Sequence, residues 1–226
     1  MKAGILSTTI SVFSAFAVSA SPSNDLLVGE DNTRGLKTKV RSSKVSKKSP
    51  KGIKKHSEAC KDPLAAVKHT LQCIADGDAV CASMGYDVAA FKKIHNGKDT
   101  GLVLGDGVSF WTFALQMSQL SFSFDHEANL GPNMASIRYI EGVQFSDGTV
   151  FGLPASDVYP FSTYFVQHEH ALVTVDDDCK MTKWDQYGDD TEQNAVDDAS
   201  FAVIGVLCAA GIFPPEVCVS LGIGPE

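Results

Sequence analysis

The clearest pattern in the chain is the alternation of apolar and polar side chains over residues 119–187. A two-residue period is typical of β-strands that have one face in a core and the other in solvent. The alternation predicts strands over residues 119–129, 134–145, 159–175 and 179–187. Between the second and third of these, Asp147-Gly148 predicts a hairpin turn, because this pair tolerates positive φ.

Helical spacing precedes the strands. Asp62 is suited to cap a helix that Pro63 opens, apolar residues then recur at helical spacing, and Gly77 ends the helix. Further helices are predicted over residues 79–84 and 107–117. The last of these carries an aromatic face with Phe110, Trp111 and Phe113, which is expected to pack in the core.

Between the helices and the sheet, Tyr86-Asp87-Val88-Ala89-Ala90-Phe91 leads into a short strand that ends at His95. This order of helices, the Tyr-Asp-x-Ala-x-Phe strand start and the closing hairpin resembles the SnoaL-like branch of the nuclear transport factor 2-like superfamily over residues 62–190. The resemblance implies the α+β fold class, in which a cone-shaped, curved sheet of mixed or antiparallel strands wraps around N-terminal helices and encloses a pocket. The chain departs from the family at Asp178-Cys179, where members often carry Asp-Gly.

The resemblance also implies where chemistry would occur. Enzymes of this superfamily perform acid–base reactions in the pocket and use no metal and no cofactor, which makes His95, Glu141 and Tyr86 the candidate catalytic residues. The candidate ligand-pocket residues are Asp87, Trp111, Phe124, His126, Tyr139 and His168. The same scaffold hosts carriers and interaction domains, so whether this chain is an enzyme stays open.

Several of these candidates are polar side chains on apolar strand faces. His126 continues the apolar face of the first strand, and Glu141 lies beside Tyr139 on the second, where burial is expected to raise the pKa of its carboxyl group. A histidine in such a position is more often a hydrogen-bonded core or rim residue than a catalyst. His168 and His170 offer only two ligands at i, i+2, without a carboxylate fixed on the same strand face, so the site would be incomplete and no metal site is predicted.

The first twenty residues have the pattern of a secretory signal peptide. A positive start is followed by a mostly apolar run over residues 5–18 and by the small-residue site Val18-Ser19-Ala20. We therefore expect a secreted protein without a membrane span, because the run is too short and too rich in hydroxyl groups to cross a bilayer.

Six cysteines in an exported chain favour disulfides over zinc, since the sequence has no CxxC pair. Six cysteines allow 15 pairings. Our preference is Cys73 with Cys81 and Cys208 with Cys218, which leaves Cys60 for Cys179, while buried free thiols remain the alternative. The pair Cys208–Cys218 would lie in a helical C-terminal extension over residues 191–226, whose apolar run at 201–213 is too short to span a membrane.

Charge divides the chain into two parts. Residues 34–61 carry eleven lysines and arginines against one acid, a net charge of +10, whereas residues 62–226 carry seven against twenty-three, a net charge of −16. The Lys-rich segment over residues 21–58 is expected to be a disordered linker or a propeptide. Residues 34–61 could also bind a polyanion, but not a nucleic acid, because no aromatic residues interleave with the lysines.

Two functions of different classes follow. The first is a secreted pocket domain that binds a small hydrophobic or amphipathic ligand, with or without cofactor-free acid–base lyase or isomerase activity. The second is a non-catalytic extracellular interaction protein that binds polyanionic material through its Lys-rich arm. A cavity lined by Tyr86, His95 and Glu141 would favour the first, and a core filled by aromatic rings the second; the rings meant are Phe113, Phe124 and Phe145. A homodimer is left open in both cases.

Overall fold

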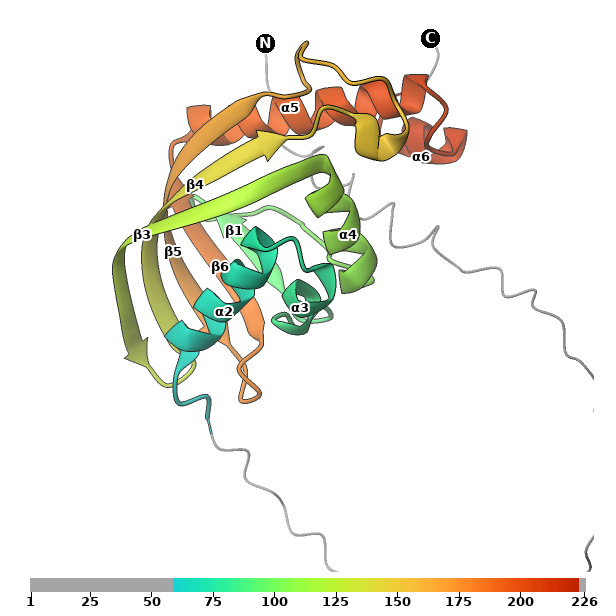
Figure 1. Ribbon diagram of the computed structural model, residues 1–226. Helices are drawn as coiled ribbons and strands as arrows, with labels where there is room; N and C mark the ends of the chain where they lie inside the picture. Colours follow the sequence, from blue (N-terminus) through green and yellow to red (C-terminus); the bar gives the residue numbers. More distant parts are fainter. Residues whose placement is uncertain (1–58, 224–226) are drawn as a thin grey trace, which may run out of the picture.

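The protein is seen here in a computed structural model that describes residues 59–223. Figure 1 shows a strongly curved sheet with helices against its inner face and further helices across one end. The inner helices are α2 (Pro63–Ala75), α3 (Ala79–Met84) and α4 (Gly107–Met117), and the other two are α5 (Asp190–Ala209) and α6 (Pro215–Ser220). The expected signal peptide and nearly all of the Lys-rich segment lie outside the described residues.

The sheet is open and mixed. Its six strands run in the order β2-β1-β6-β5-β4-β3, and β1 and β6 form the parallel pair. The strands are β1 (Lys92–His95), β2 (Lys98–Asp99), β3 (Ser118–Gly131), β4 (Met134–Phe145), β5 (Tyr164–Val175) and β6 (Met181–Gly188). Helices gathered on the inner face of an open, curved sheet confirm the α+β cone architecture that the sequence predicts.

Each inner helix begins at an aspartate. Asp62 accepts a hydrogen bond from the backbone N–H of Ala65 at 3.0 Å, and Asp78 and Asp106 cap α3 and α4 in the same way. A capping side chain satisfies a backbone donor that the helix itself leaves unpaired. The predicted bounds of α3 and α4 are confirmed, and the caps at Asp78 and Asp106 explain why these helices begin where they do.

One strand starts later than the alternation predicts. β5 begins at Tyr164, and residues 146–163 form a long connection that includes the 3₁₀ turn η1 (Thr149–Phe151). Gly148 does adopt a positive φ of 90°, as expected for Asp-Gly, but it opens this excursion instead of closing a tight hairpin. The predicted hairpin turn is therefore wrong, whereas the positive φ expected for Gly148 is confirmed.

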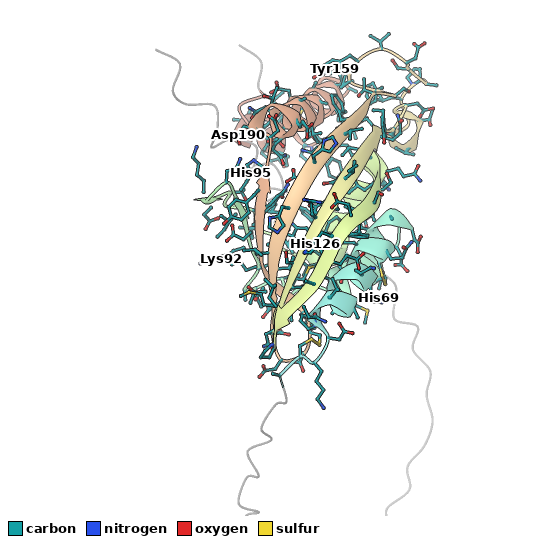
Figure 2. All side chains as sticks on the ribbon, turned by 90° about the vertical axis from the view of Figure 1, so that its left-hand side faces the viewer. His69, Lys92, His95, His126, Tyr159 and Asp190 are labelled. Carbon is teal, nitrogen blue, oxygen red and sulfur yellow. A yellow bond between two sulfur atoms is a disulfide. The ribbon has the colours of Figure 1, made fainter. Side chains whose placement is uncertain are left out.

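A β-bulge overturns the assignment of His126. The register of β3 against β4 shifts between Phe124 and His126, so that His126 pairs with Arg138 on the outer face of the sheet. A bulge adds one residue to a strand and moves every later side chain to the opposite face. His126 is exposed and lies outside the pocket region for which it was predicted, as Figure 2 shows.

The interior divides into two apolar clusters. The first lies between α2, α3, α4 and the sheet, and it includes Tyr86, Trp111 and Tyr139. The second lies beneath α5 and α6, where Ile204 and Leu207 pack with other core residues at one end of the sheet. The C-terminal helices therefore share a core with the sheet instead of forming a separate unit.

All three predicted disulfides are present: Cys60–Cys179, Cys73–Cys81 and Cys208–Cys218. The first joins the start of the described chain to the turn between β5 and β6, the second joins α2 to α3, and the third joins α5 to α6. Within residues 59–223, no helix combines the length and apolar character needed to cross a membrane.

Candidate functional site

A belt of polar side chains crosses the inner face of the sheet between the two apolar clusters. On β4, Glu141 stands between Tyr139 of the first cluster and Val143 of the second. On β5, Gln167 and Glu169 occupy the corresponding place between Phe165 and Ala171. Buried polar groups cost free energy unless they are paired, so a belt of them inside a core indicates a site.

The strand register brings two carboxyl groups together in this belt. Glu141 lies opposite Gln167 and Tyr139 lies opposite Glu169, which makes the two glutamates diagonal neighbours across β4 and β5. Such neighbours are separated by about 7–8 Å along the sheet surface. The charge of Glu141 therefore disfavours ionisation of Glu169, in addition to the larger cost of burial.

Glu169 is the more unusual of the pair. Its side chain is only 3% exposed, and neither carboxyl oxygen has a well-formed hydrogen bond to a described residue. Burial raises the pKa of Glu169 to about 7, although Gln186 and Lys93 lie close enough to oppose part of that rise. A carboxylic acid that titrates near neutrality can act as a proton donor or acceptor at physiological pH.

Glu141 and the nearby tyrosines are shifted in the same direction. Burial raises the pKa of Glu141, as expected, and the positive charge of Lys93 opposes part of this rise. Burial, reinforced by the charge of Glu141, also raises the pKa values of Tyr86 and Tyr139. Both phenols therefore keep their protons and remain hydrogen-bond donors.

Gly188 makes room for Glu169. The two residues are opposite each other on β6 and β5, and a Cβ built on Gly188 would lie 2.7 Å from the carboxyl carbon of Glu169. The carboxyl group of Glu169 thus lies over β6, in space that any other residue would fill. Consequently, the position of this carboxyl group depends on a missing side chain on the neighbouring strand.

Aromatic rings line the adjoining part of the first cluster. The rings of Tyr86 and Trp111 are 5.5 Å apart, and those of Tyr139 and Trp184 are 6.1 Å apart. Trp111 also has a buried Nε1 with no hydrogen-bond partner among the described residues. The chain has two tryptophans, and both are in this cluster, so tryptophan fluorescence reports directly on the site.

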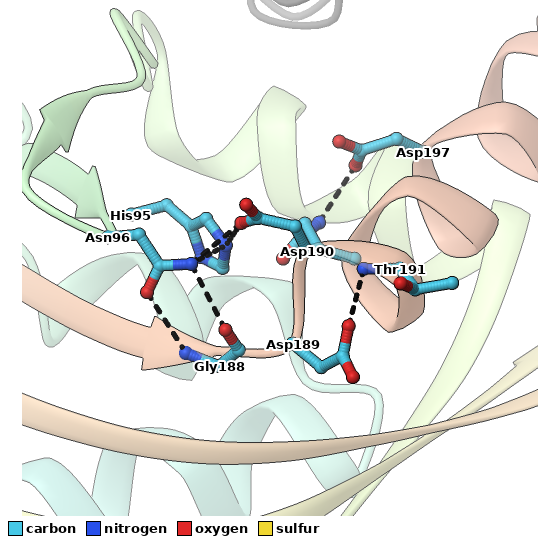
Figure 3. Close-up of polar contacts among 8 residues, drawn as sticks. His95, Asn96, Gly188, Asp189, Asp190, Thr191 and Asp197 are labelled. Carbon is cyan, nitrogen blue, oxygen red and sulfur yellow. Dashed lines mark hydrogen bonds and ion pairs between the residues drawn. The ribbon is translucent and has the colours of Figure 1, made fainter.

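At the edge of the belt, His95 contacts the first turn of α5. Its Nε2 lies 3.1 Å from Asp190 Oδ1, and its Nδ1 is buried without a partner among the described residues. The amide of Asn96 binds Asp190 and the backbone of Gly188 in the same group. Figure 3 shows these contacts converging from the end of β1 and the start of α5.

Other predicted pocket residues lie elsewhere. The carboxylate of Asp87 accepts hydrogen bonds from the backbone N–H groups of Ala89 and Ala90, and it therefore serves a turn. His168 lies on the outer face, where it pairs with Glu192 of α5 at 3.0 Å and is 63% exposed. Phe124 is partly buried against the first cluster, with Lys68 Nζ 5.3 Å from its ring centre.

The sequence prediction missed Lys93, Gln167, Glu169 and Gln186. A signal for Glu169 was present, because it alternates with Ala171, Val173 and Val175 on one apolar face, as Glu141 does on its own strand. His168 and His170, which alternate with Glu169, lie on the opposite face and drew attention away from this pattern. Lys93 carried no such signal, since lysines at the start of a short strand are ordinary.

A second group of side chains has the composition of a metal site. Ligand atoms of His69, Cys73 and Cys81 lie within 4.8 Å of one another. The two sulfurs are joined in a disulfide, however, and only thiolates coordinate metals strongly. In this oxidised state the group cannot act as a three-ligand centre.

No family model and no curated protein matches the chain. Solved structures of similar shape include an LEH-like epoxide hydrolase of M. tuberculosis, at 9% identity, with 64% of this chain and 96% of that chain covered and a TM-score of 0.45. Another is the Delta 5-3-ketosteroid isomerase from Mycobacterium sp., at 13% identity, with 56% and 92% covered and a TM-score of 0.42. A third is an NTF-2 like protein of unknown function from Shewanella oneidensis MR-1, at 14% identity, with 56% and 96% covered and a TM-score of 0.39.

The element order and the open mixed sheet around α2, α3 and α4 agree with the cone-shaped α+β architecture that the sequence resemblance implies. At such identities and scores, the activities of the similar structures say nothing about what this chain binds.

Proposed function

We propose that the inner face of the sheet is an acid–base site for a small apolar or amphipathic molecule in a secreted protein. The observation that carries the proposal is Glu169, a buried carboxyl group with a pKa of about 7, no well-formed hydrogen bond at either oxygen and Glu141 as its diagonal neighbour. Strongly perturbed titratable groups in an apolar interior are typical of functional sites.

The chemistry that suits this arrangement is proton transfer next to a carbonyl or hydroxyl group. A protonated carboxyl group donates a hydrogen bond to an oxygen on which negative charge develops, and a second group removes the proton. Glu141 and Glu169 supply the acid, and the phenols of Tyr86 and Tyr139 are further donors nearby. The aromatic rings of the first cluster would contact the apolar part of the molecule.

The first experiment measures proton abstraction from a range of simple carbon acids. A panel of small enolisable ketones is incubated with the protein in D₂O, and deuterium uptake at the α-carbon is followed by NMR. Glu169→Gln should lower the exchange rate about 100-fold or more, because it keeps the shape of the side chain and removes its proton. Glu216→Gln, an exposed glutamate of α6, is the matched control and should exchange like the wild type.

Tryptophan fluorescence separates binding from chemistry in the same panel. A ligand that changes the fluorescence of Trp111 and Trp184 without α-proton exchange would identify a carrier and contradict the acid–base proposal. If nothing binds in the interior while the full chain is retained on heparin, the interaction protein with a polyanion-binding arm becomes the better explanation.

Protein stability offers an independent check on Glu169. Its pKa is about 7 in the folded state and has the ordinary value of 4.5 in the unfolded chain. Between these pH values the folded state holds a proton that the unfolded state has lost, so the free energy of unfolding falls as pH rises and levels off above about 7. Urea unfolding should therefore show Glu169→Gln gaining on the wild type between pH 5 and pH 8, on the order of 2 kcal/mol after allowance for residual solvation. A constant difference between the two proteins would show that Glu169 titrates normally.

A further inference from the structure

The hydrogen bonds around Asn96 indicate which ring nitrogen of His95 carries the hydrogen in the neutral imidazole. The side-chain oxygen of Asn96 accepts from the backbone N–H of Gly188 at 3.3 Å, which fixes the orientation of the amide. Its nitrogen then donates one hydrogen to the Gly188 carbonyl at 3.0 Å and the other to Asp190 Oδ1 at 2.6 Å. An amide NH₂ group has two hydrogens, and both are used.

It follows that His95 Nε2 receives no hydrogen from Asn96, although the two nitrogens are 3.1 Å apart. The partner left for Nε2 is Asp190 Oδ1 at 3.1 Å, which can only accept. Nε2 therefore carries the proton and donates it. In the neutral ring, Nδ1 then has no proton, and its lone pair faces the interior.

The two sides of the ring are in contrasting surroundings. The side chain of Asp190 is 70% exposed, whereas that of His95 is 14% exposed and its Nδ1 is fully buried. On the inner side, Asp197 of α5 lies close enough to His95 and Lys93 for both to lower its pKa, against a larger rise caused by burial. Gln193, which donates to Asp197 at 2.9 Å, has a buried and unpaired Oε1 in the same region.

We propose that His95 is the proton acceptor of the site, that Nδ1 is its reacting atom, and that Asp190 and Asn96 are the residues that position it. This inference rests on the acid–base function proposed above and assigns its missing base. Nδ1 takes a proton from the substrate, the imidazolium is stabilised by the negative charge of Asp190, and Nδ1 returns to the product a hydrogen that has exchanged with solvent, which in D₂O is a deuteron. Asp190 is the first residue of α5, so the start of this helix completes the site.

Nitrogen NMR tests the tautomer without any substrate. Long-range ¹H–¹⁵N spectra of the full-length, ¹⁵N-labelled protein should show Nε2 of His95 protonated and Nδ1 unprotonated. Asp190→Ala removes the acceptor and should give a mixture of tautomers, whereas Asp190→Asn can still present an oxygen and should keep the Nε2–H form. Glu192→Ala, which removes the exposed partner of His168, should change the His168 signals and leave those of His95 as they are.

The α-proton exchange assay then separates the two proposals. Both Asp190 variants should lower the rate of α-proton exchange at least about tenfold. In Asp190→Asn the imidazolium lacks a counter-charge, and in Asp190→Ala it lacks the counter-charge and His95 is also a mixture of tautomers. If Glu169→Gln abolishes exchange while Asp190→Ala keeps both the rate and the tautomer, the acid–base function stands and this inference is wrong. A protonated Nδ1 in the wild type would also overturn it. If the Nε2–H tautomer is found but no ketone exchanges, the geometry stands and the proposed function fails.

Discussion

Gly188→Ala should disable the site although it adds a single methyl group. The new Cβ would overlap the carboxyl group of Glu169, which is itself enclosed and has little space to move. Inserting a methyl group into a packed interior typically costs about 1–3 kcal/mol. The free energy of unfolding should fall by that amount in urea titrations, and α-proton exchange should be lost because Glu169 is displaced.

Gly205→Ala is the matched control. Gly205 lies within α5, and a Cβ at this position would meet no atom within 4 Å. Alanine is the better helix former by about 0.5–1 kcal/mol, so this variant should be slightly more stable than the wild type and equally active. Gly188 has no positive φ, so backbone strain cannot explain a difference between the two variants. Wild-type stability and activity in Gly188→Ala would refute the placement of Glu169 over β6.

The second large effect concerns the disulfides. Removing Cys60–Cys179 should destabilise the protein by about 5 kcal/mol, because this bond closes a loop with a sequence separation of 119 residues. Removing Cys208–Cys218, with a separation of 10, should cost about 3 kcal/mol on the same reasoning. Double serine variants compared by thermal unfolding should show this order, and melting temperatures should fall by roughly 2–4 °C per kcal/mol.

The Cys208→Ser/Cys218→Ser variant serves as the control for the loss of a disulfide as such. A larger loss from that variant than from Cys60→Ser/Cys179→Ser would mean that contacts around α6, and not chain entropy, dominate the stability of the described region.

The parts of the fold that the sequence could predict are those governed by neighbours in the chain. The start of α2 followed from Asp62 and Pro63, the bounds of α3 and α4 followed from their helical pattern, and Gly148 adopted the positive φ that Asp-Gly favours. The face of His126 was beyond such reasoning, because its bulge depends on the pairing of β3 with β4. Local pattern cannot reveal where a ladder slips by one residue.

The candidate site was predictable to a similar degree. Glu141 could be named because it is a polar residue on an apolar strand face, and Tyr86 because it belongs to the family pattern. The structure places Glu141 in the belt and Tyr86 in the adjoining first cluster. The partner of His95 is 95 residues away in the sequence, at the first residue of α5. Long-range pairings of this kind are fixed by the tertiary fold, so the sequence could point to the histidine but not to the carboxylate that orients it.

The position of α5 has a consequence for folding during synthesis. Synthesis proceeds from the N-terminus, and domains begin to fold as they emerge, so the sheet can form before residues 190–209 have been made. Until then Val143 and Phe145 lack the apolar side chains of α5 and α6 that complete their cluster, and the disulfide Cys208–Cys218 cannot form. During this time one apolar end of the sheet is only partly covered. A chaperone or a second nascent chain can then bind this end in competition with α5.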